Sequence, residues 1–167
     1  MLLPIIDINK QPSVKVSVEN LLNDAVLALQ VKTQIPEGWQ DKTLEFTVRF
    51  SDDAEVQKLN NDFRGMNKPT NVLSFPCGED MPYTPEKYDK NKVPVKYIGD
   101  IIVSCDTLER EALEQGKSVD DHLSHLLVHS ILHLYGYDHI DDAEAEAMEN
   151  LEIDILAGLA INDPYHK

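Results

Sequence analysis

Histidine is concentrated in one short segment of this chain. Five of its six histidines lie between residues 120 and 139, which read DDHLSHLLVHSILHLYGYDH. Ser118, followed by Asp121 three residues later, is typical of a helix N-terminus, and Gly136 suits the left-handed residue that ends many helices. Apolar residues recur between the histidines with helical spacing. We therefore expect one helix that begins at Ser118, runs through Leu134 and ends at Gly136, with the histidines along one side.

The spacing of three of these histidines predicts a metal site. His129 and His133 are four residues apart, so on a helix their Cβ atoms lie about 5–6 Å apart on the same side. Gly136 can adopt a positive φ and turn the chain, which lets His139 close on the pair. With three histidine ligands and one open position, zinc lowers the pKa of its bound water to about 7. We therefore expect one Zn²⁺ ion held by His129, His133 and His139 plus water, in a catalytic site.

The same helix allows a second interpretation. Histidines can be solvated or buried without binding an ion, but with only six among 167 residues a match at both fixed offsets rarely arises by chance. His122 and His125 share the stripe and cannot join the other three on one ion. We expect these two beside the ligands or facing substrate, rather than simply exposed. His166, near the C-terminus, is expected to be inert.

The remaining segments predict a single α+β domain. A chain of this length buries roughly 70% of its unfolded surface without disulfides or a second module, so residues 1–167 are expected to form one domain. Alternating apolar and polar residues predict half-buried strands, and apolar stripes predict helices. The expected strands are 2–8, 44–50, 72–75 and 98–104, and the expected helices are 16–31, 51–63, 108–116, 118–134 and one that begins at 141.

This order of elements implies a small mixed β-sheet covered by helices, with the metal site at the end of a central helix. A loop-like region from Cys77 to Tyr97 separates two of the strands, and it carries three prolines among scattered charges. A loop of this length is uncommon inside a compact domain. We therefore expect it to be mobile or functional.

Charge and composition exclude several classes of protein. The chain has 15 Lys+Arg against 30 Asp+Glu and a net charge of −15, which repels phosphate backbones at long range and excludes a general basic nucleic-acid binder. The apolar run at its start is too short for a signal peptide, and none of its apolar runs is long enough to span a membrane, so we expect neither feature. Its two cysteines, Cys77 and Cys105, are most simply reduced thiols. These features predict a soluble cytoplasmic protein with neither membrane nor DNA as a partner.

The histidine spacing also occurs in another class of enzyme. The pattern H-x-x-x-H-x-x-G-x-x-H is that of the metzincin metalloproteases, in which the residue after the first histidine is a glutamate general base. Here that residue is Ser130, which has no useful basicity near neutral pH. The missing glutamate disfavours a metal-dependent peptidase, which stays open as an alternative.

A second segment supports a different assignment. Residues 59–76 read LNNDFRGMNKPTNVLSFP, and they are followed by Gly99-Asp100-Ile101 and then by the histidine cluster. From about Leu44 to Asp163-Pro164-Tyr165 the chain resembles the YbeY family of bacterial endoribonucleases. The most specific parts of this resemblance are R-G…K-P-T-N-V-L-S-F-P and H-x-x-x-H-L-x-G-Y-D-H.

The resemblance implies a metal-dependent endoribonuclease, a hydrolase that acts on the phosphodiester bonds of RNA. Its expected substrate is single-stranded ribosomal RNA, cleaved with zinc during maturation of the 3′ end of the small-subunit RNA and in ribosome quality control. Ribosomal or small-subunit proteins are the expected partners. A noncatalytic ribosome-assembly factor, in which zinc only stiffens the fold, is the alternative from another class.

The resemblance also implies roles for particular residues. His129, His133 and His139 match the metal ligands of the family, and Arg64 matches its characteristic active-site arginine. A guanidinium offers paired donors to phosphate oxygens and stabilises charge that develops on a phosphodiester under attack. The alternative for Arg64 is a cap on the C-terminus of its helix.

Two positions leave the mechanism open. The family usually has Gly where Ser130 stands, so activity or specificity could differ if that Gly lets substrate approach the metal. No carboxylate is placed by the sequence as a general base. Asp138 is available, although it could instead orient a ligand imidazole through its second nitrogen.

The charges are unevenly distributed along the chain. Residues 58–96 carry seven basic and five acidic residues, whereas residues 138–154 carry eight acidic residues and no basic one. We expect a basic strip near Arg64 and weak, salt-sensitive affinity for RNA. The acidic run is interpreted as a solvated helix face.

Overall fold

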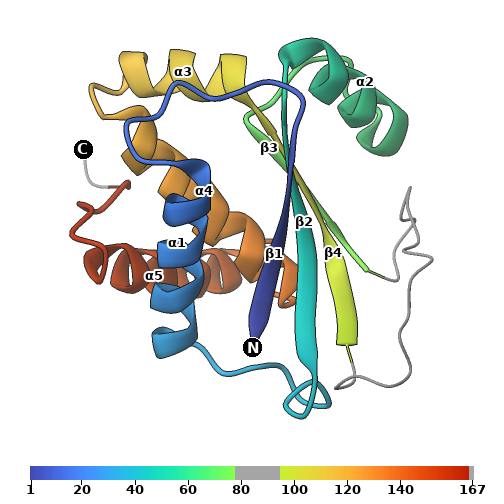
Figure 1. Cartoon of the computed structure of the whole chain (residues 1–167), viewed down its shortest axis with the longest axis vertical. Helices are drawn as coiled ribbons and strands as arrows, with labels where there is room; N and C mark the ends of the chain where they lie inside the picture. The colour runs from blue at the N-terminus through green and yellow to red at the C-terminus, as the bar shows by residue number, and fades with distance from the viewer. Residues whose placement is uncertain (78–94, 166–167) are drawn as a thin grey trace.

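The central element of the protein is a mixed four-stranded sheet. The computed structural model describes residues 1–77 and 95–165, and within them the strands lie in the order β1-β2-β4-β3 (Figure 1). Strands β1, β2 and β4 are parallel, and β3 is antiparallel to β4. The strands are β1 (Leu2–Ile8), β2 (Thr43–Ser51), β3 (Val72–Pro76) and β4 (Val95–Ser104). The predicted α+β class with a small mixed sheet is confirmed.

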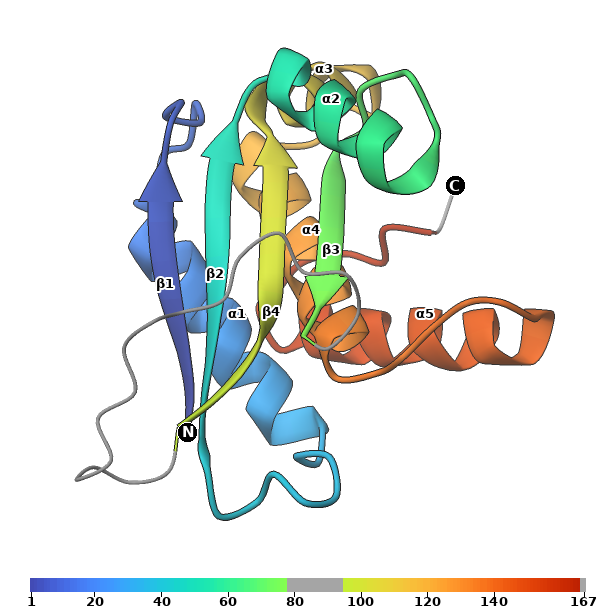
Figure 2. The same ribbon diagram turned by 90° about the vertical axis from the view of Figure 1, so that its right-hand side faces the viewer.

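Helices cover this sheet unevenly. The helices are α1 (Val18–Lys32), α2 (Asp53–Arg64), α3 (Cys105–Glu114), α4 (Val119–Leu134) and α5 (Asp142–Ala157). Figures 1 and 2 show α1, α4 and α5 together on one side of the sheet, with α2 on the other side. Helix α4 packs against α1, α3, α5 and β3, which makes it the central helix that the sequence predicted.

The core follows the alternation of the strands. In β2 the side chains of Leu44, Phe46, Val48 and Phe50 are all buried and face the helices, as their period of two predicts. A smaller cluster of Val56, Leu73 and Ile102 joins α2 to the opposite face of the sheet. Burial on both faces fixes β3 and β4 in place, and the ends of α2 and α4 with them.

Two predicted element starts are three residues too late. Helix α3 begins at Cys105 and not at residue 108, because the Ser104 hydroxyl caps it by accepting the Thr107 N–H. Strand β4 begins at Val95, three residues before the expected start, because the segment from Val95 to Tyr97 pairs with Thr43–Glu45 of β2. The rest of the predicted loop, residues 78–94, and also His166 lie outside the described residues. None of the helices in the described ranges has the length and apolarity needed to cross a membrane.

Gly99 allows β3 and the end of α4 to approach each other closely. Its φ is +146°, and a Cβ atom there would lie 2.4 Å from the carbonyl oxygen of Phe75 in β3 and 2.7 Å from Leu134 Cδ2 in α4. A side chain at this position would therefore push both neighbours away. Because Gly99 has no side chain, the C-terminal end of α4, which carries the histidines, can pack closely against the sheet.

Candidate metal centre

Helix α4 has the ends that the sequence predicts. The Ser118 hydroxyl accepts a hydrogen bond from the Asp121 N–H at 3.1 Å. The helix ends at Leu134, and Gly136 has a φ of +99°. The turn brings Tyr137 back over the helix, so that its carbonyl oxygen lies 2.9 Å from His133 Nδ1. This geometry positions the residues that follow beside the last turn of α4.

The structure brings together the three histidines that the sequence singled out. One ring nitrogen from each of His129, His133 and His139 lies within 4.8 Å of the others. The ring centroids of His129 and His133 are 4.6 Å apart, and that of His139 is 5.1 Å from His133. The side chain of His129 is 25% exposed, and His139 is exposed. The cluster is therefore recessed but open to a ligand.

A buried carboxylate from α5 supports this cluster. Glu152 is 0% exposed, and its two oxygens accept hydrogen bonds from His129 Nδ1 and from the Tyr165 hydroxyl. Burial by itself would raise the pKa of Glu152, but His125, His129 and Tyr165 together lower it to about 2. Glu152 is therefore an ionised acceptor at neutral pH.

These hydrogen bonds determine which ring nitrogens of His129 and His133 carry a proton. Carbonyl and carboxylate oxygens only accept, so Nδ1 carries the proton in both His129 and His133. When both rings are neutral, their Nε2 atoms therefore face each other 3.0 Å apart, lone pair against lone pair. Two ligands of a tetrahedral zinc ion lie about 3.3 Å apart. A divalent cation fits this spacing and removes the repulsion, so the donor set fits a metal ion.

The surroundings of His133 also favour the protonation state that metal binding requires. Burial and the neighbouring His129 lower the pKa of His133 below its usual value, which favours the neutral ring. A neutral imidazole binds a metal through its free nitrogen, whereas an imidazolium has none.

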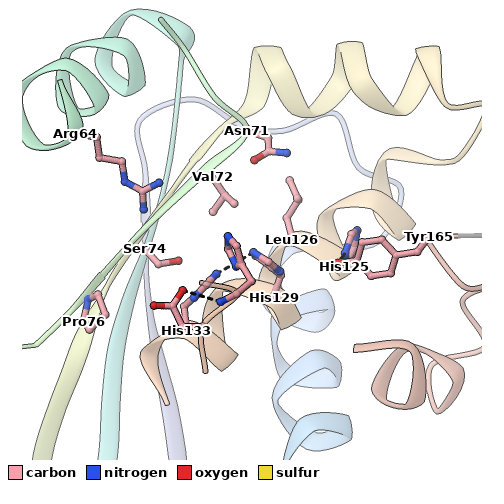
Figure 3. Close-up of a pocket in the computed structure, with 12 residues that line it drawn as sticks. Arg64, Asn71, Val72, Ser74, Pro76, His125, Leu126, His129, His133 and Tyr165 are labelled. Carbon is pink, nitrogen blue, oxygen red and sulfur yellow. Dashed lines mark hydrogen bonds between the residues drawn. The ribbon is translucent and has the colours of Figure 1, made fainter. Parts of the chain in front are cut away.

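A cavity of about 570 Å³ extends from the histidines toward β3 and α2 (Figure 3). Its walls include Asn71 and Ser74 of the β3 segment, Asp138 of the turn and Tyr165 of the C-terminal segment. Arg64, the last residue of α2, projects into the cavity from the side opposite α4, as Figure 3 shows.

Arg64 does not cap its own helix. The N–H of Gly65, which has a φ of +67°, closes the end of α2 on the carbonyl oxygen of Asn61 at 3.0 Å. Within residues 1–77 and 95–165 the guanidinium of Arg64 makes no hydrogen bond or ion pair. The structure thus disfavours the capping alternative, and the five donors of this exposed cation remain available to an anion in the cavity.

The other histidines of α4 differ from one another. His125 lies in the wall of the cavity, with Nε2 3.2 Å from the Tyr165 hydroxyl. His122 is 3% exposed and faces Glu111 of α3 at 3.6 Å, outside the set of residues that line the cavity. Of these two histidines, only His125 therefore lies where we expected both, beside the cluster and facing the cavity. The expectation is wrong for His122.

Two further positions clarify the predicted mechanism. Ser130 is fully buried and does not line the cavity, so its hydroxyl does not lie in the path of a substrate. Asp138 accepts the N–H of His139 at 2.7 Å. The carboxylate that accepts a hydrogen bond from an imidazole of the cluster is that of Glu152.

Sequence reasoning missed Glu152 and Tyr165 as parts of this site. The acidic run was interpreted as a solvated helix face, and most of its members are exposed, but this interpretation is wrong for Glu152. A signal was present: Glu152 follows Met148 by four residues and precedes Ile155 and Leu156, and these three are buried. A carboxylate on the buried stripe of a helix is rare unless it is paired.

The fold and the site together define a class of protein: a small α+β domain with three histidines clustered at the end of its central helix. The sequence matches the family model for Endoribonuclease YbeY over residues 5–160. The chain belongs to the YbeY family, which confirms the predicted resemblance.

Similar proteins agree with this assignment. Endoribonuclease YbeY of Alteromonas mediterranea is 51% identical over 129 residues, covering 77% of this chain and 74% of that protein. The protein of the same name from Rhizobium etli is 53% identical over 121 residues, or 72% of this chain and 66% of its own length. The solution structure of TM1509 from Thermotoga maritima is 23% identical, with a TM-score of 0.50 over 98% of this chain and 100% of that one. That likeness supports the fold alone.

Proposed function

We propose that this chain is a zinc-dependent endoribonuclease, with residues 1–167 as one metallo-endoribonuclease domain. Its relatives are named endoribonucleases, which supports a hydrolase that acts on RNA. The observation that carries the proposal is the convergence of three imidazoles, within 4.8 Å, in a cavity that Arg64 enters from the opposite side. A metal site and an exposed cation facing one cavity suit the cleavage of a phosphodiester.

His129, His133 and His139 are the proposed ligands. An all-imidazole donor set with a tetrahedral spacing suits zinc, with water as the fourth ligand. When bound, such an ion acts as a Lewis acid and lowers the pKa of its water to about 7. The protein contributes the orientation of the rings of His129 and His133, through Glu152 and Tyr137.

Arg64 is the proposed catalytic residue. Its guanidinium is held at the end of α2, across the cavity from the ligands. Paired N–H donors on the side of the cavity opposite α4 suit the nonbridging oxygens of a phosphate that lies over the metal site. The negative charge on these oxygens increases during attack, so that Arg64 stabilises the transition state more than the bound substrate.

The proposed substrate is single-stranded ribosomal RNA, processed at the 3′ end of the small-subunit RNA and during ribosome quality control in the cytoplasm. Recessed ligands favour a strand whose backbone can bend into the cavity over a rigid duplex. The net charge of −15 weakens the attraction of RNA over long distances. Ribosomal or small-subunit proteins would therefore help to deliver the substrate.

The test compares wild type with His133→Ala and Arg64→Ala. Bound metal is measured by elemental analysis, and cleavage is measured on single-stranded RNA, double-stranded RNA and casein. We expect His133→Ala to lose metal and RNA cleavage together. Arg64→Ala should keep the metal while kcat falls by about 100-fold or more. Lys58→Ala, which removes an exposed cation from the same helix, is the matched control and should change KM only modestly.

Three results would overturn the proposal. RNA cleavage that persists in metal-free His133→Ala would place the activity elsewhere or in a contaminant. Cleavage of casein but not of RNA would favour the peptidase alternative, and stoichiometric metal without any cleavage would favour the assembly factor.

A further inference from the structure

Glu152 differs from the other acidic residues of α5. It is completely buried, whereas Glu144, Glu146 and Glu149 are exposed. A carboxylate loses a large hydration free energy on burial, so it is retained inside a protein only where hydrogen bonds or charges replace the water. Its surroundings therefore indicate what it does.

The first partner of Glu152 is a proposed metal ligand. Glu152 Oε1 accepts the hydrogen bond from His129 Nδ1. An isolated neutral imidazole can carry its proton on either nitrogen, and only the tautomer with Nδ1–H presents a free Nε2 to the cluster. The carboxylate selects this tautomer and fixes the plane of the ring.

The second partner holds the carboxylate itself. The Tyr165 hydroxyl donates to Glu152 Oε2, and it lies 3.2 Å from His125 Nε2, which can donate to it. Tyr165 comes from the segment after α5, and its own N–H is held by Asp163 at 2.8 Å. A chain of hydrogen bonds therefore runs from His125 through Tyr165 and Glu152 to His129, and joins α4, α5 and the C-terminal segment.

The two helical ligands are supported differently. His133 Nδ1 donates to a neutral backbone carbonyl, that of Tyr137, whereas His129 Nδ1 donates to a charged group. A hydrogen bond to an ionised acceptor is roughly twice as strong as one to a neutral acceptor. It also increases the basicity of the opposite ring nitrogen. Of the two, His129 should therefore be the ligand that depends on a side chain for its orientation.

We propose that Glu152 is a positioning residue for the metal site: held by Tyr165, its buried carboxylate fixes the His129 ring so that Nε2 points at the ion. The proposal rests on the assignment of His129 as a ligand in the proposed function. It predicts that removal of the carboxylate weakens metal binding in a protein that still folds.

The variants for this test are Glu152→Gln, Glu152→Ala and Tyr165→Phe. Gln keeps the volume and an oxygen that accepts from His129, but removes the charge. Phe removes only the hydroxyl that holds the carboxylate. Glu146→Gln is the matched control, because it removes the same charge from an exposed position of α5.

Three measurements do not depend on RNA cleavage. Heteronuclear NMR of the ring nitrogens gives the tautomer of His129 in the metal-free protein. Competition with a chromophoric chelator gives the dissociation constant for Zn²⁺, and thermal unfolding of the metal-free protein shows whether each variant folds. Cleavage of single-stranded RNA is measured separately at saturating zinc, as kcat and KM.

We expect zinc affinity to fall by about 10-fold in Glu152→Gln and by up to about 100-fold in Glu152→Ala, with a smaller loss in Tyr165→Phe. His129 should keep its Nδ1–H tautomer in Glu152→Gln and become a mixture in Glu152→Ala. Glu146→Gln should match wild type. At saturating zinc, the kcat of the Glu152 and Tyr165 variants should be closer to the wild-type value than the kcat of Arg64→Ala.

Folded Glu152→Gln with a zinc dissociation constant within twofold of wild type would overturn the proposal, as would an unchanged tautomer in folded Glu152→Ala. If Glu152→Ala does not fold, the zinc affinities of Glu152→Gln and Tyr165→Phe decide. Normal RNA cleavage with unchanged zinc binding in these variants would refute the positioning role and leave the proposed function intact. Zinc binding that depends on Glu152, without RNA cleavage by wild type, would refute only the function.

Discussion

Helix α4 carries two pairs of histidines that behave differently. His122 and His125, three residues apart, have ring centroids separated by 6.3 Å and tilted by 50°. His129 and His133, four apart, have centroids separated by 4.6 Å, and their Nε2 atoms are 3.0 Å apart. Within the described part of the chain, only the second pair gains a third histidine close enough to share an ion. The same residue type on one helix therefore forms a site only where a turn brings the chain back.

The surroundings of the two pairs reinforce this difference. Burial, with help from Lys117, lowers the pKa of His122 to about 4, so this ring is neutral and packed between α4 and α3. His129 and His133 instead line a cavity, and each has an oxygen acceptor on Nδ1 that directs Nε2 toward the other. The spacing of both pairs is compatible with a shared ion. Only His129 and His133 have neighbours that direct their Nε2 atoms toward each other.

The largest expected effect concerns the turn that distinguishes the pairs. His139→Ala removes the ligand that α4 itself does not supply. We expect RNA cleavage to fall by at least about 1,000-fold, since a bound metal contributes several kcal/mol of transition-state stabilisation. His139 is exposed, so thermal unfolding of the metal-free protein should change little. Stoichiometric tight zinc binding by this variant, measured by chelator competition, would show that two helical histidines suffice.

The next effect tests how the C-terminal half of α4 is held against the sheet. Gly99→Ala places a methyl group against Phe75 and Leu134, which should reduce the free energy of unfolding by about 3 kcal/mol. Gly116→Ala is the matched control: its φ is also positive, but nothing lies within 4 Å, so strain alone should cost about 1 kcal/mol. Urea unfolding measures both variants. Equal losses would contradict the close packing at Gly99.

A smaller effect is expected for a substitution that lowers the stability of the fold without changing the metal site. Asp53, the first residue of α2, accepts hydrogen bonds from Ser104 and Thr107 at 2.5 and 2.6 Å. Burial by itself would raise the pKa of Asp53, but these bonds and Arg110 lower it below its usual value. Asp53→Asn should reduce the free energy of unfolding by about 1 kcal/mol without changing zinc affinity.

The pH dependence of this loss follows from the direction of the shift. A carboxyl group with a lowered pKa stabilises the folded state fully above its unfolded pKa of about 3.9. This stabilisation is lost as the pH falls through the lower folded value. The difference between wild type and Asp53→Asn in urea unfolding should therefore be constant from pH 7 to about pH 5 and shrink toward pH 3. A difference that grows in acid would contradict the shift.

The smallest effect is expected at His122, which lies outside the cluster of three histidines. His122→Leu replaces a buried ring whose nitrogens have no hydrogen-bond partner among the described residues. Replacing such a group by an apolar side chain of similar size should change the free energy of unfolding by less than about 1 kcal/mol. Zinc binding and RNA cleavage should match wild type. Loss of zinc in a folded His122→Leu protein would break the distinction between the two pairs.

Local sequence patterns determined much of the fold and the cluster of three histidines. The caps at Ser118 and Gly136 and the alternation in β2 depend on neighbouring residues and on the periods of helix and strand, so they could be predicted. The spacing of His129, His133 and His139 predicted their convergence for the same reason. The start of β4 could not be predicted, because Val95 joins the strand only through its pairing with β2.

The tertiary structure alone decided which residues support the three histidines and which residue faces them across the cavity. Arg64 reaches the cavity because α2 packs on β3 and β4, and Glu152 reaches His129 because α5 packs on α4. Tyr165 completes the support from the far end of the chain. Such contacts join residues separated by 13 to 40 positions, and no local period encodes which of many similar acids or cations will be brought together. That choice is made by the packing of helices on the sheet, which the burial of apolar faces drives.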